Sequence, residues 1–193
     1  MGNNKKLNEF YNWYTDNILS LLKNINFKNL QLATNFIEET IKKNKNIYIC
    51  GNGGSLSLAN HYMCDYLKGL TINTNLKPQV RSLCADNALI SAIANDISYD
   101  DIFYFQGKKL FKKGDLLILI SCSGNSKNIK KVLKYANKIN IKSIGFSAFD
   151  GGYLHKNSSV SLNFKINHYG ISEDINQILM HFIMSFINQK NRK

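Results

Sequence analysis

The spacing of hydrophobic positions divides the chain into helical and strand-forming stretches. Between residues 7 and 44, apolar residues recur every three or four positions, which predicts amphipathic helix. Asn26 and Asn29 interrupt this pattern, so we expect two helices. Five short apolar runs follow, and such runs are typical of strands buried on both faces of a parallel sheet. These runs are residues 46–50, 80–84, 115–120, 141–146 and 160–166.

Helical stretches separate the apolar runs. They are expected from the loop at 51–55 to about residue 70, over 88–94, over 102–107, from the loop at 121–126 to about residue 138, and over 172–188. This alternation predicts an α/β fold, in which a mostly parallel sheet carries helices on both faces. No linker or repeat splits the chain, so we expect one domain. Its helical region (1–45) would pack in an oligomer, and its core (46–193) would bind the ligand.

The chain is basic, with 25 Lys and Arg against 13 Asp and Glu and a net charge of +12. Such a charge is compatible with nucleic acid, a membrane surface or a phosphorylated ligand. The lysines are spread along the chain, however, and no Arg-rich arm, zinc finger or aromatic RNA-binding motif accompanies them. We therefore interpret them as solvated surface residues and expect no nucleic-acid partner.

Neither a membrane span nor a secretory signal is expected. No apolar run reaches 18 residues, and the first residues have no apolar signal core. The cysteines, which lack CxxC spacing, are Cys50, Cys64, Cys84 and Cys122. This arrangement does not fit a zinc finger or a disulfide framework. Reduced, mostly buried thiols are typical of the cytoplasm, which is the expected location.

Two loops that follow strands are rich in glycine and serine, namely Gly51–Ser55 and Ser121–Ser126. Each lies at the carboxyl end of a strand and opens a helix, where the backbone amides and the helix dipole favour an anion. One such loop could simply be a turn with a helix cap. Two in one small sheet favour a ligand, and the three serines of the second loop suit a phosphate monoester. Neither loop has the GxGxxG spacing of a dinucleotide site or the GK[ST] of a Walker-type ATPase.

Two helices carry polar residues at helical spacing. His61 and Asp65 share a face of the helix after the first loop, and Glu173, Gln177 and His181 line a face of the last helix. If the two helices converge, these residues could hold Zn²⁺ or a similar ion, or act as an acid/base pair. A further polar pair is Asn95–Asp96, which is either a helix end or directed at the site.

Together and in this order, these motifs resemble the sugar-isomerase (SIS) domain family. The motifs are Gly51–Ser55 with His61, Ala92–Asp96, and Ser121–Ser126. Within the family, the chain is most similar to the phosphoheptose isomerases. The resemblance implies a flavodoxin-like, mostly parallel five-stranded sheet with additional N-terminal helices. It also implies a homotetramer with active sites at subunit contacts.

The resemblance also implies an activity and roles for individual residues. The activity is isomerisation of sedoheptulose 7-phosphate to D-glycero-D-manno-heptose 7-phosphate through an enediol. The sugar phosphate would be held by Asn52, Gly53, Gly54, Ser55, Ser121, Cys122, Ser123 and Ser126. Asn95 and Asp96 would reach the sugar. The positions of the family's zinc ligands are occupied by His61, Asp65, Glu173 and His181, so Zn²⁺ is the implied cofactor.

The chain departs from the family in its catalytic half. The family has Glu at the position of Asp65 and usually Gln at the position of Glu173. It also has a histidine where this chain has Asn176, and a different loop at 167–170. The candidate base is therefore either Asp65 or Glu173, and the candidate acid is His181. The alternative is a non-catalytic regulatory protein that binds sugar phosphates, like the relative that associates with the bacterial replication initiator.

Overall fold

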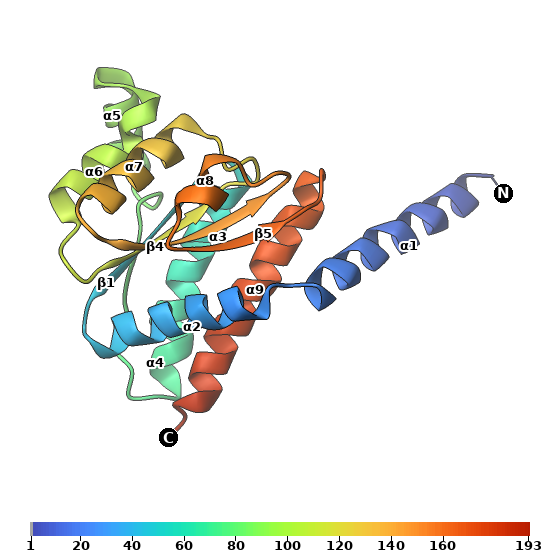
Figure 1. The fold of residues 1–193 in the computed structure, drawn as a ribbon, viewed down its shortest axis with the longest axis horizontal. Coiled ribbons are helices and arrows are strands. Elements are labelled where there is room, and N and C mark those ends of the chain that lie inside the picture. The colour runs from blue at the N-terminus through green and yellow to red at the C-terminus, as the bar shows by residue number, and fades with distance from the viewer. Residues whose placement is uncertain (1) are drawn as a thin grey trace.

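A five-stranded parallel sheet forms the centre of the computed structural model, which describes residues 2–193 (Figure 1). The strand order is β2-β1-β3-β4-β5, and every neighbouring pair is parallel. This is the flavodoxin-like order. It confirms the predicted sheet, with ends that differ by a few residues. The strands are β1 (Asn46–Gly51), β2 (Gln79–Ser82), β3 (Leu116–Ile120), β4 (Lys142–Ala148) and β5 (Val160–Phe164).

Helices cover both faces of the sheet. One layer contains α2, α3 and α9, and the other contains α7 and α8, with α6 beside α7 (Figure 1). The helices are α1 (Gly2–Lys23), α2 (Phe27–Lys42), α3 (Gly54–Cys64), α4 (Leu70–Ile72), α5 (Asn87–Asp96), α6 (Ile102–Leu110), α7 (Lys127–Lys138), α8 (Gly152–Asn157) and α9 (Tyr169–Lys190). A short 3₁₀ turn, η2 (Tyr99–Asp101), precedes α6.

The sheet owes its central position to its apolar strands. Every residue of β3 is buried, and the cluster of buried apolar side chains runs from β3 into both helical layers. Three of the cysteines are buried and Cys64 is exposed, all as free thiols in the part of the chain that the structure describes. Among residues 2–193, no helix combines the length and the apolar character needed to cross a bilayer.

The helix after the first loop changes geometry part-way. α3 runs directly into a π-helical turn, η1 (Asp65–Gly69), and then into α4. π-helical turns are rare and are frequent at functional sites. The Tyr62 hydroxyl donates to the Asn176 carbonyl oxygen at 2.6 Å. Because both side chains are fully buried, this bond fixes α3 against α9.

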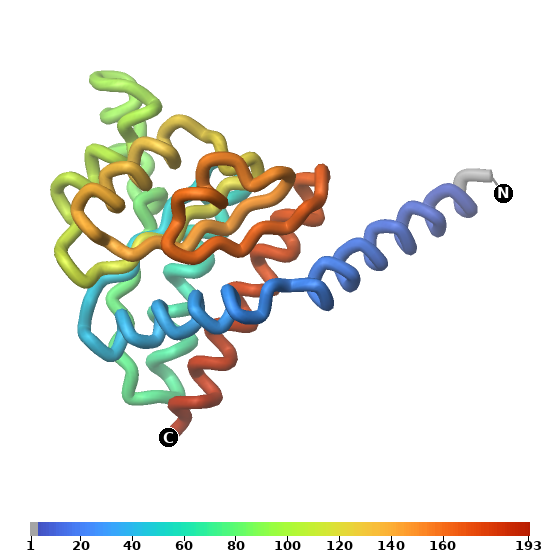
Figure 2. Tube along the Cα trace, viewed as in Figure 1, coloured from blue at the N-terminus to red at the C-terminus, as the bar shows by residue number. Residues whose placement is uncertain are grey.

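Helix α1 extends away from the rest of the molecule, so the start of this helix lies far from the C-terminus (Figures 1 and 2). Its later turns contact the start of α9, where the Tyr14 hydroxyl donates to Asp174 at 2.5 Å and Trp13 packs on His168. Large apolar side chains remain exposed along the helix, including Leu7, Phe10 and Tyr11. An amphipathic helix with an uncovered apolar face is typical of a contact surface.

Glu38 joins α2 to the end of α9 and gives stability a pH dependence. It accepts hydrogen bonds from Lys190, Lys42 and Asn191 at 2.8, 2.6 and 3.2 Å. Burial opposes ionisation, but these bonds prevail and lower the pKa of Glu38 to about 2. The stabilisation is therefore complete above the unfolded-state pKa of about 4.3 and disappears as the pH falls towards 2.

We expect Glu38→Gln to lower the free energy of unfolding by about 1–3 kcal/mol at pH 7. The difference from the parent should shrink as the pH falls from about 5 towards 2. Urea unfolding followed by circular dichroism at several pH values measures both effects. Glu39→Gln is a matched control, because Glu39 is an exposed neighbour whose ion pair with Lys43 lies on the surface. An equal loss in both variants, or a difference that does not change with pH, would contradict the assignment.

Candidate active site

The two glycine- and serine-rich loops meet at one edge of the sheet. β1 and β3 are parallel neighbours, so the loops that follow them leave the same edge side by side. In this strand order, the chain turns to opposite faces of the sheet after β1 and β3, and such a switch point is where open α/β sheets bind ligands. α3 and α7 begin at these loops, and their N-terminal backbone amides therefore face the same space.

A cavity of about 170 Å³ lies between the loops and is open to solvent. Serine hydroxyls dominate its lining, and the Oγ atoms of Ser121 and Ser126 are 3.5 Å apart. The full lining is Asn52, Ser55, Ile120, Ser121, Cys122, Ser123, Ser126, Tyr169 and Glu173. Its hydroxyls can surround a phosphate.

Asn52 is held in place by two residues outside the cavity. Its amide exchanges two hydrogen bonds with the Asn128 amide, each 2.9 Å long. The Tyr99 hydroxyl also donates to Asn52 Oδ1 at 3.1 Å. Asn128 lies in the first turn of α7, so this network ties the first loop to the helix that follows the second loop.

Glu173 brings a carboxylate into the same cavity from α9. A β-carbon on Gly54 would crowd this carboxylate, so the carboxylate lies directly against the Gly54 backbone. The charge of Glu173 also acts on the second loop, residues 121–126. Burial, and after it the Glu173 carboxylate, raises the pKa of the Cys122 thiol to about 11. Cys122 is therefore a neutral thiol at physiological pH, and Glu173 is the cavity's acid/base candidate.

Next to the cavity, α3 and α9 bring together His61, Asp65 and His181. Asp65 Oδ2 lies 3.2 Å from His61 Nε2 and 3.1 Å from His181 Nε2, and the two ring nitrogens are 3.4 Å apart. Asp65 Oδ2 is buried and has no hydrogen-bond partner within residues 2–193. Three lone-pair donors thus face one another, an arrangement that a cation or protons must stabilise.

The donor set fits a divalent metal ion. Tetrahedral Zn²⁺ with ligands at about 2.0–2.1 Å keeps neighbouring ligand atoms roughly 3.3 Å apart, close to the three separations found here. Imidazole nitrogen and carboxylate oxygen are both common Zn²⁺ ligands. The ligand atoms of all three residues lie within 4.8 Å of one another. Residues 61, 65 and 181 can therefore hold such an ion.

Comparison with known proteins identifies the family. The SIS domain model matches residues 11–148, which is well over half of the chain. The chain belongs to the SIS domain family. Two relatives are phosphoheptose isomerases. The one from Campylobacter concisus is 35% identical over 133 residues (69% of this chain and 70% of the relative), and the one from Aliarcobacter butzleri is 33% identical over 161 residues (83% and 85%).

A solved structure agrees in fold with this chain over almost its whole length. Phosphoheptose isomerase from Neisseria gonorrhoeae superimposes with a TM-score of 0.87, at 23% identity, over 96% of this chain and 98% of that one. The similarity therefore includes the N-terminal helices as well as the sheet.

The expected site residues fall into a group at the cavity, a neighbouring group of possible metal ligands, and a separate pair at the end of α5. Asn52, Ser55, Ser121, Cys122, Ser123, Ser126 and Glu173 line the cavity. Gly53 and Gly54, at the start of α3, do not line it, although Gly54 lies against the Glu173 carboxylate. His61, Asp65 and His181 form the second group. Glu173 is not part of this second group. Asn95 and Asp96 lie exposed at the end of α5 and do not line the cavity.

Three supporting residues were not recognised in the sequence. Tyr169 lines the cavity, and its place in the unusual 167–170 loop was the available signal. Asn128 and Tyr99 orient Asn52 through contacts that no local spacing reveals. Asn176, which replaces a family histidine, is buried with its amide unpaired among the described residues. It is thus part of the packing between α3 and α9.

Proposed function

We propose that this protein is an aldose–ketose isomerase that converts sedoheptulose 7-phosphate to D-glycero-D-manno-heptose 7-phosphate. The observation that carries the proposal is the single cavity in which serine hydroxyls from one loop and the Glu173 carboxylate face the same space. The first group suits the phosphate, and the second suits proton transfer at carbon. The phosphoheptose isomerases among its relatives support this substrate class.

The residues divide the reaction between them. The serine loop and the amides at the start of α7 bind the phosphate and so orient the distant carbonyl end. Glu173 removes the proton from the hydroxyl-bearing carbon next to the carbonyl and returns it to the former carbonyl carbon, through an enediol. The proton of the neighbouring hydroxyl passes to the former carbonyl oxygen, so the reaction is balanced without any other reactant. Asp65, the other candidate base, has an oxygen already engaged between His61 and His181. We therefore assign the proton transfer to Glu173.

We assign the cluster of His61, Asp65 and His181 to the carbonyl oxygen of the substrate. A divalent cation such as Zn²⁺, held by His61, Asp65 and His181, would polarise the carbonyl and offset the negative charge that develops on its oxygen. His181 Nε2 points at Asp65 and His61, which favours the ligand role over that of a proton donor. The substitution His181→Ala should therefore abolish turnover and leave folding and phosphate binding nearly intact.

Proton NMR in D₂O with sedoheptulose 7-phosphate and added Zn²⁺ tests the activity. Isomerisation should produce new aldose anomeric signals and deuterium at C2, because the base exchanges its proton with solvent. No exchange, from folded protein shown to bind the compound, would overturn the proposed reaction. That result would point to another sugar phosphate or to a regulatory binder.

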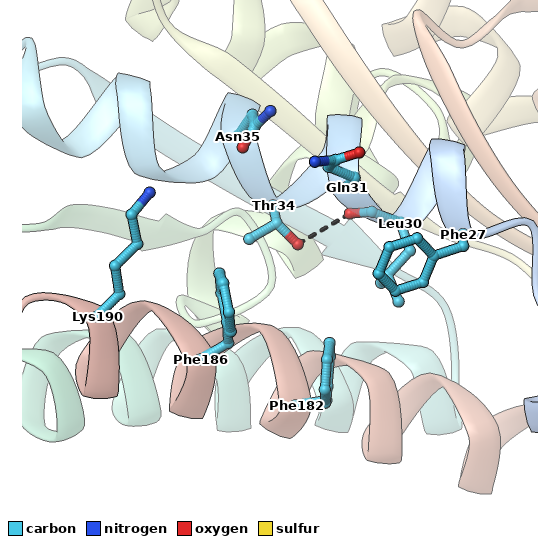
Figure 3. A pocket seen from close by; sticks show the side chains of 8 residues that line it. All are labelled: Phe27, Leu30, Gln31, Thr34, Asn35, Phe182, Phe186 and Lys190. Carbon is cyan, nitrogen blue, oxygen red and sulfur yellow. Dashed lines mark hydrogen bonds between the residues drawn. The ribbon is translucent and has the colours of Figure 1, made fainter.

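We also propose that copies of the chain assemble through α1 as a homotetramer in the cytoplasm. A groove of about 190 Å³ between α2 and α9 is lined by the exposed rings of Phe27, Phe182 and Phe186 (Figure 3). The exposed apolar face of α1 is of matching chemistry and reaches well beyond its own subunit. A second copy's α1 is therefore the occupant we propose for the groove. The free, mostly buried thiols agree with a reducing compartment.

Charged residues in the groove should dissociate the assembly. We expect light scattering to give a tetramer's mass for the parent and a smaller mass for the double variant Phe182→Asp with Phe186→Asp. Tyr11→Asp with Phe10→Asp, on α1, should have the same effect. Exposed Lys156→Asp, on α8 and away from the groove, is the control. A monomeric parent, or a groove variant that retains the parent's mass, would contradict this mode of assembly.

A further inference from the structure

We propose that Gln177 supplies the fourth ligand of the metal site and thereby frees Glu173 for the substrate cavity. The inference rests on the proposed function because it concerns the same site. It differs from the ligand set that the family resemblance implied, in which position 173 provides the fourth donor.

Gln177 is already in contact with the cluster. Its side-chain amide lies 2.8 Å from His181 Nε2, which is also the atom that faces Asp65 and His61. The two ends of a glutamine amide are distinguished only by their hydrogen bonds, so Oε1 can take this place by a flip of the amide. Oε1 then lies beside His181 Nε2 as a fourth donor, after two imidazole nitrogens and one carboxylate oxygen, and four donors complete a tetrahedral zinc site.

Helix geometry explains why Gln177 reaches the cluster and Glu173 does not. Gln177 is one turn before His181, about 6 Å along the axis and roughly 40° around it. Glu173 is eight residues before His181, which places it about 12 Å along the axis and roughly 80° around it. Its carboxylate accordingly lies against Gly54, and it does not belong to the group of ligand atoms within 4.8 Å of one another.

The exchange has a chemical consequence. A site of two neutral imidazoles, one carboxylate and one amide carries a single negative charge, so a bound divalent ion keeps a net positive charge. A second carboxylate would neutralise it. The amide ligand therefore preserves the polarising power of the ion towards a carbonyl oxygen. It also leaves the Glu173 carboxylate free to accept a proton.

Metal titration of the full-length chain tests this assignment without measuring turnover. Protein stripped with a chelator is titrated with Zn²⁺ against a competing dye, and with Co²⁺ by its visible absorption. We expect Gln177→Leu to weaken Zn²⁺ binding about 10–100-fold and to change the Co²⁺ band. Gln177→Glu, which restores an oxygen donor, should recover the affinity. Gln189→Leu, an exposed position on the same helix, and Glu173→Gln should both bind Zn²⁺ as the parent does.

Three outcomes would overturn the inference. They are a parent that binds no Zn²⁺, a Gln177→Leu variant with the parent's affinity and Co²⁺ spectrum, and a Glu173→Gln variant that loses as much affinity as Gln177→Leu. Thermal unfolding of the metal-free variants separates a damaged fold from a lost ligand. Because no substrate is present, the result stands or falls independently of the isomerase assay.

Discussion

A Glu173→Gln variant should isomerise its sugar phosphate about 10²–10⁴-fold more slowly than the parent, with a similar KM. Glutamine keeps the size and polarity of the side chain but cannot accept a proton from carbon. The serine loop, to which we assign phosphate binding, is unchanged in this variant, so substrate affinity should be maintained. Steady-state kinetics gives kcat and KM, and loss of C2 deuterium exchange in the NMR assay identifies the step that fails.

A double variant makes this prediction sharper. The resemblance on which the site assignment rests implies Glu at position 65 and Gln at position 173 in the family, so the longer carboxylate would stand at the other position there. Adding Asp65→Glu to Glu173→Gln therefore restores the family's arrangement. We expect the double variant to regain at least tenfold in kcat over Glu173→Gln alone, because the longer side chain can reach the substrate from η1.

The contrary results are equally specific. A Glu173→Gln variant with the parent's kcat would exclude Glu173 as the base. If Asp65→Asn then lost activity while retaining Zn²⁺, the proton transfer would belong to Asp65. Asp174→Asn is the matched control, since Asp174 is the adjacent carboxylate but binds Tyr14 outside the cavity. It should keep the parent's kcat.

Local sequence pattern predicted most of the fold because the sheet is built from local signals. β3 is five consecutive apolar residues with every side chain buried, and its identity required no tertiary information. α8 was not predicted, because six residues are too few to show a helical period. Its start at Gly151–Gly152, both with positive φ, resembles a turn.

The position of Glu173 shows what spacing cannot determine. Residues eight apart share a helix face only approximately, and whether the drift of roughly 80° matters depends on what stands opposite. Opposite Glu173 stands Gly54, which has no side chain and so accepts the carboxylate. Opposite His181 stand His61 and Asp65. Which partner each residue meets follows from how α3 and α9 cross, and that crossing is set by buried contacts such as the bond from Tyr62 to Asn176.

Gly124→Ala should be among the most destabilising single changes in this chain, costing about 2–5 kcal/mol. Gly124 has a φ of +62°, in the left-handed region that costs an alanine roughly 1–2 kcal/mol. A β-carbon there would also collide with the carbonyl of Gly151. That neighbour is backbone and cannot turn aside. Leu154 N–H donates to the Gly124 carbonyl at 3.0 Å, so α8 is held against the same loop.

Gly114→Ala separates the two contributions to this cost. Gly114 has a φ of +93°, but a β-carbon there would meet only the flexible side chain of Lys45. It should therefore show the backbone strain alone, about 1–2 kcal/mol, with unchanged activity. Urea unfolding compares the two variants. If they lose equal stability, the Gly151 carbonyl yields to the new methyl group. A larger loss of stability in Gly124→Ala, together with weaker binding of sugar phosphate, would show that the contact of Gly124 with Gly151 holds the serines in place. The reason is that Gly124 itself belongs to the serine loop, to which we assign phosphate binding.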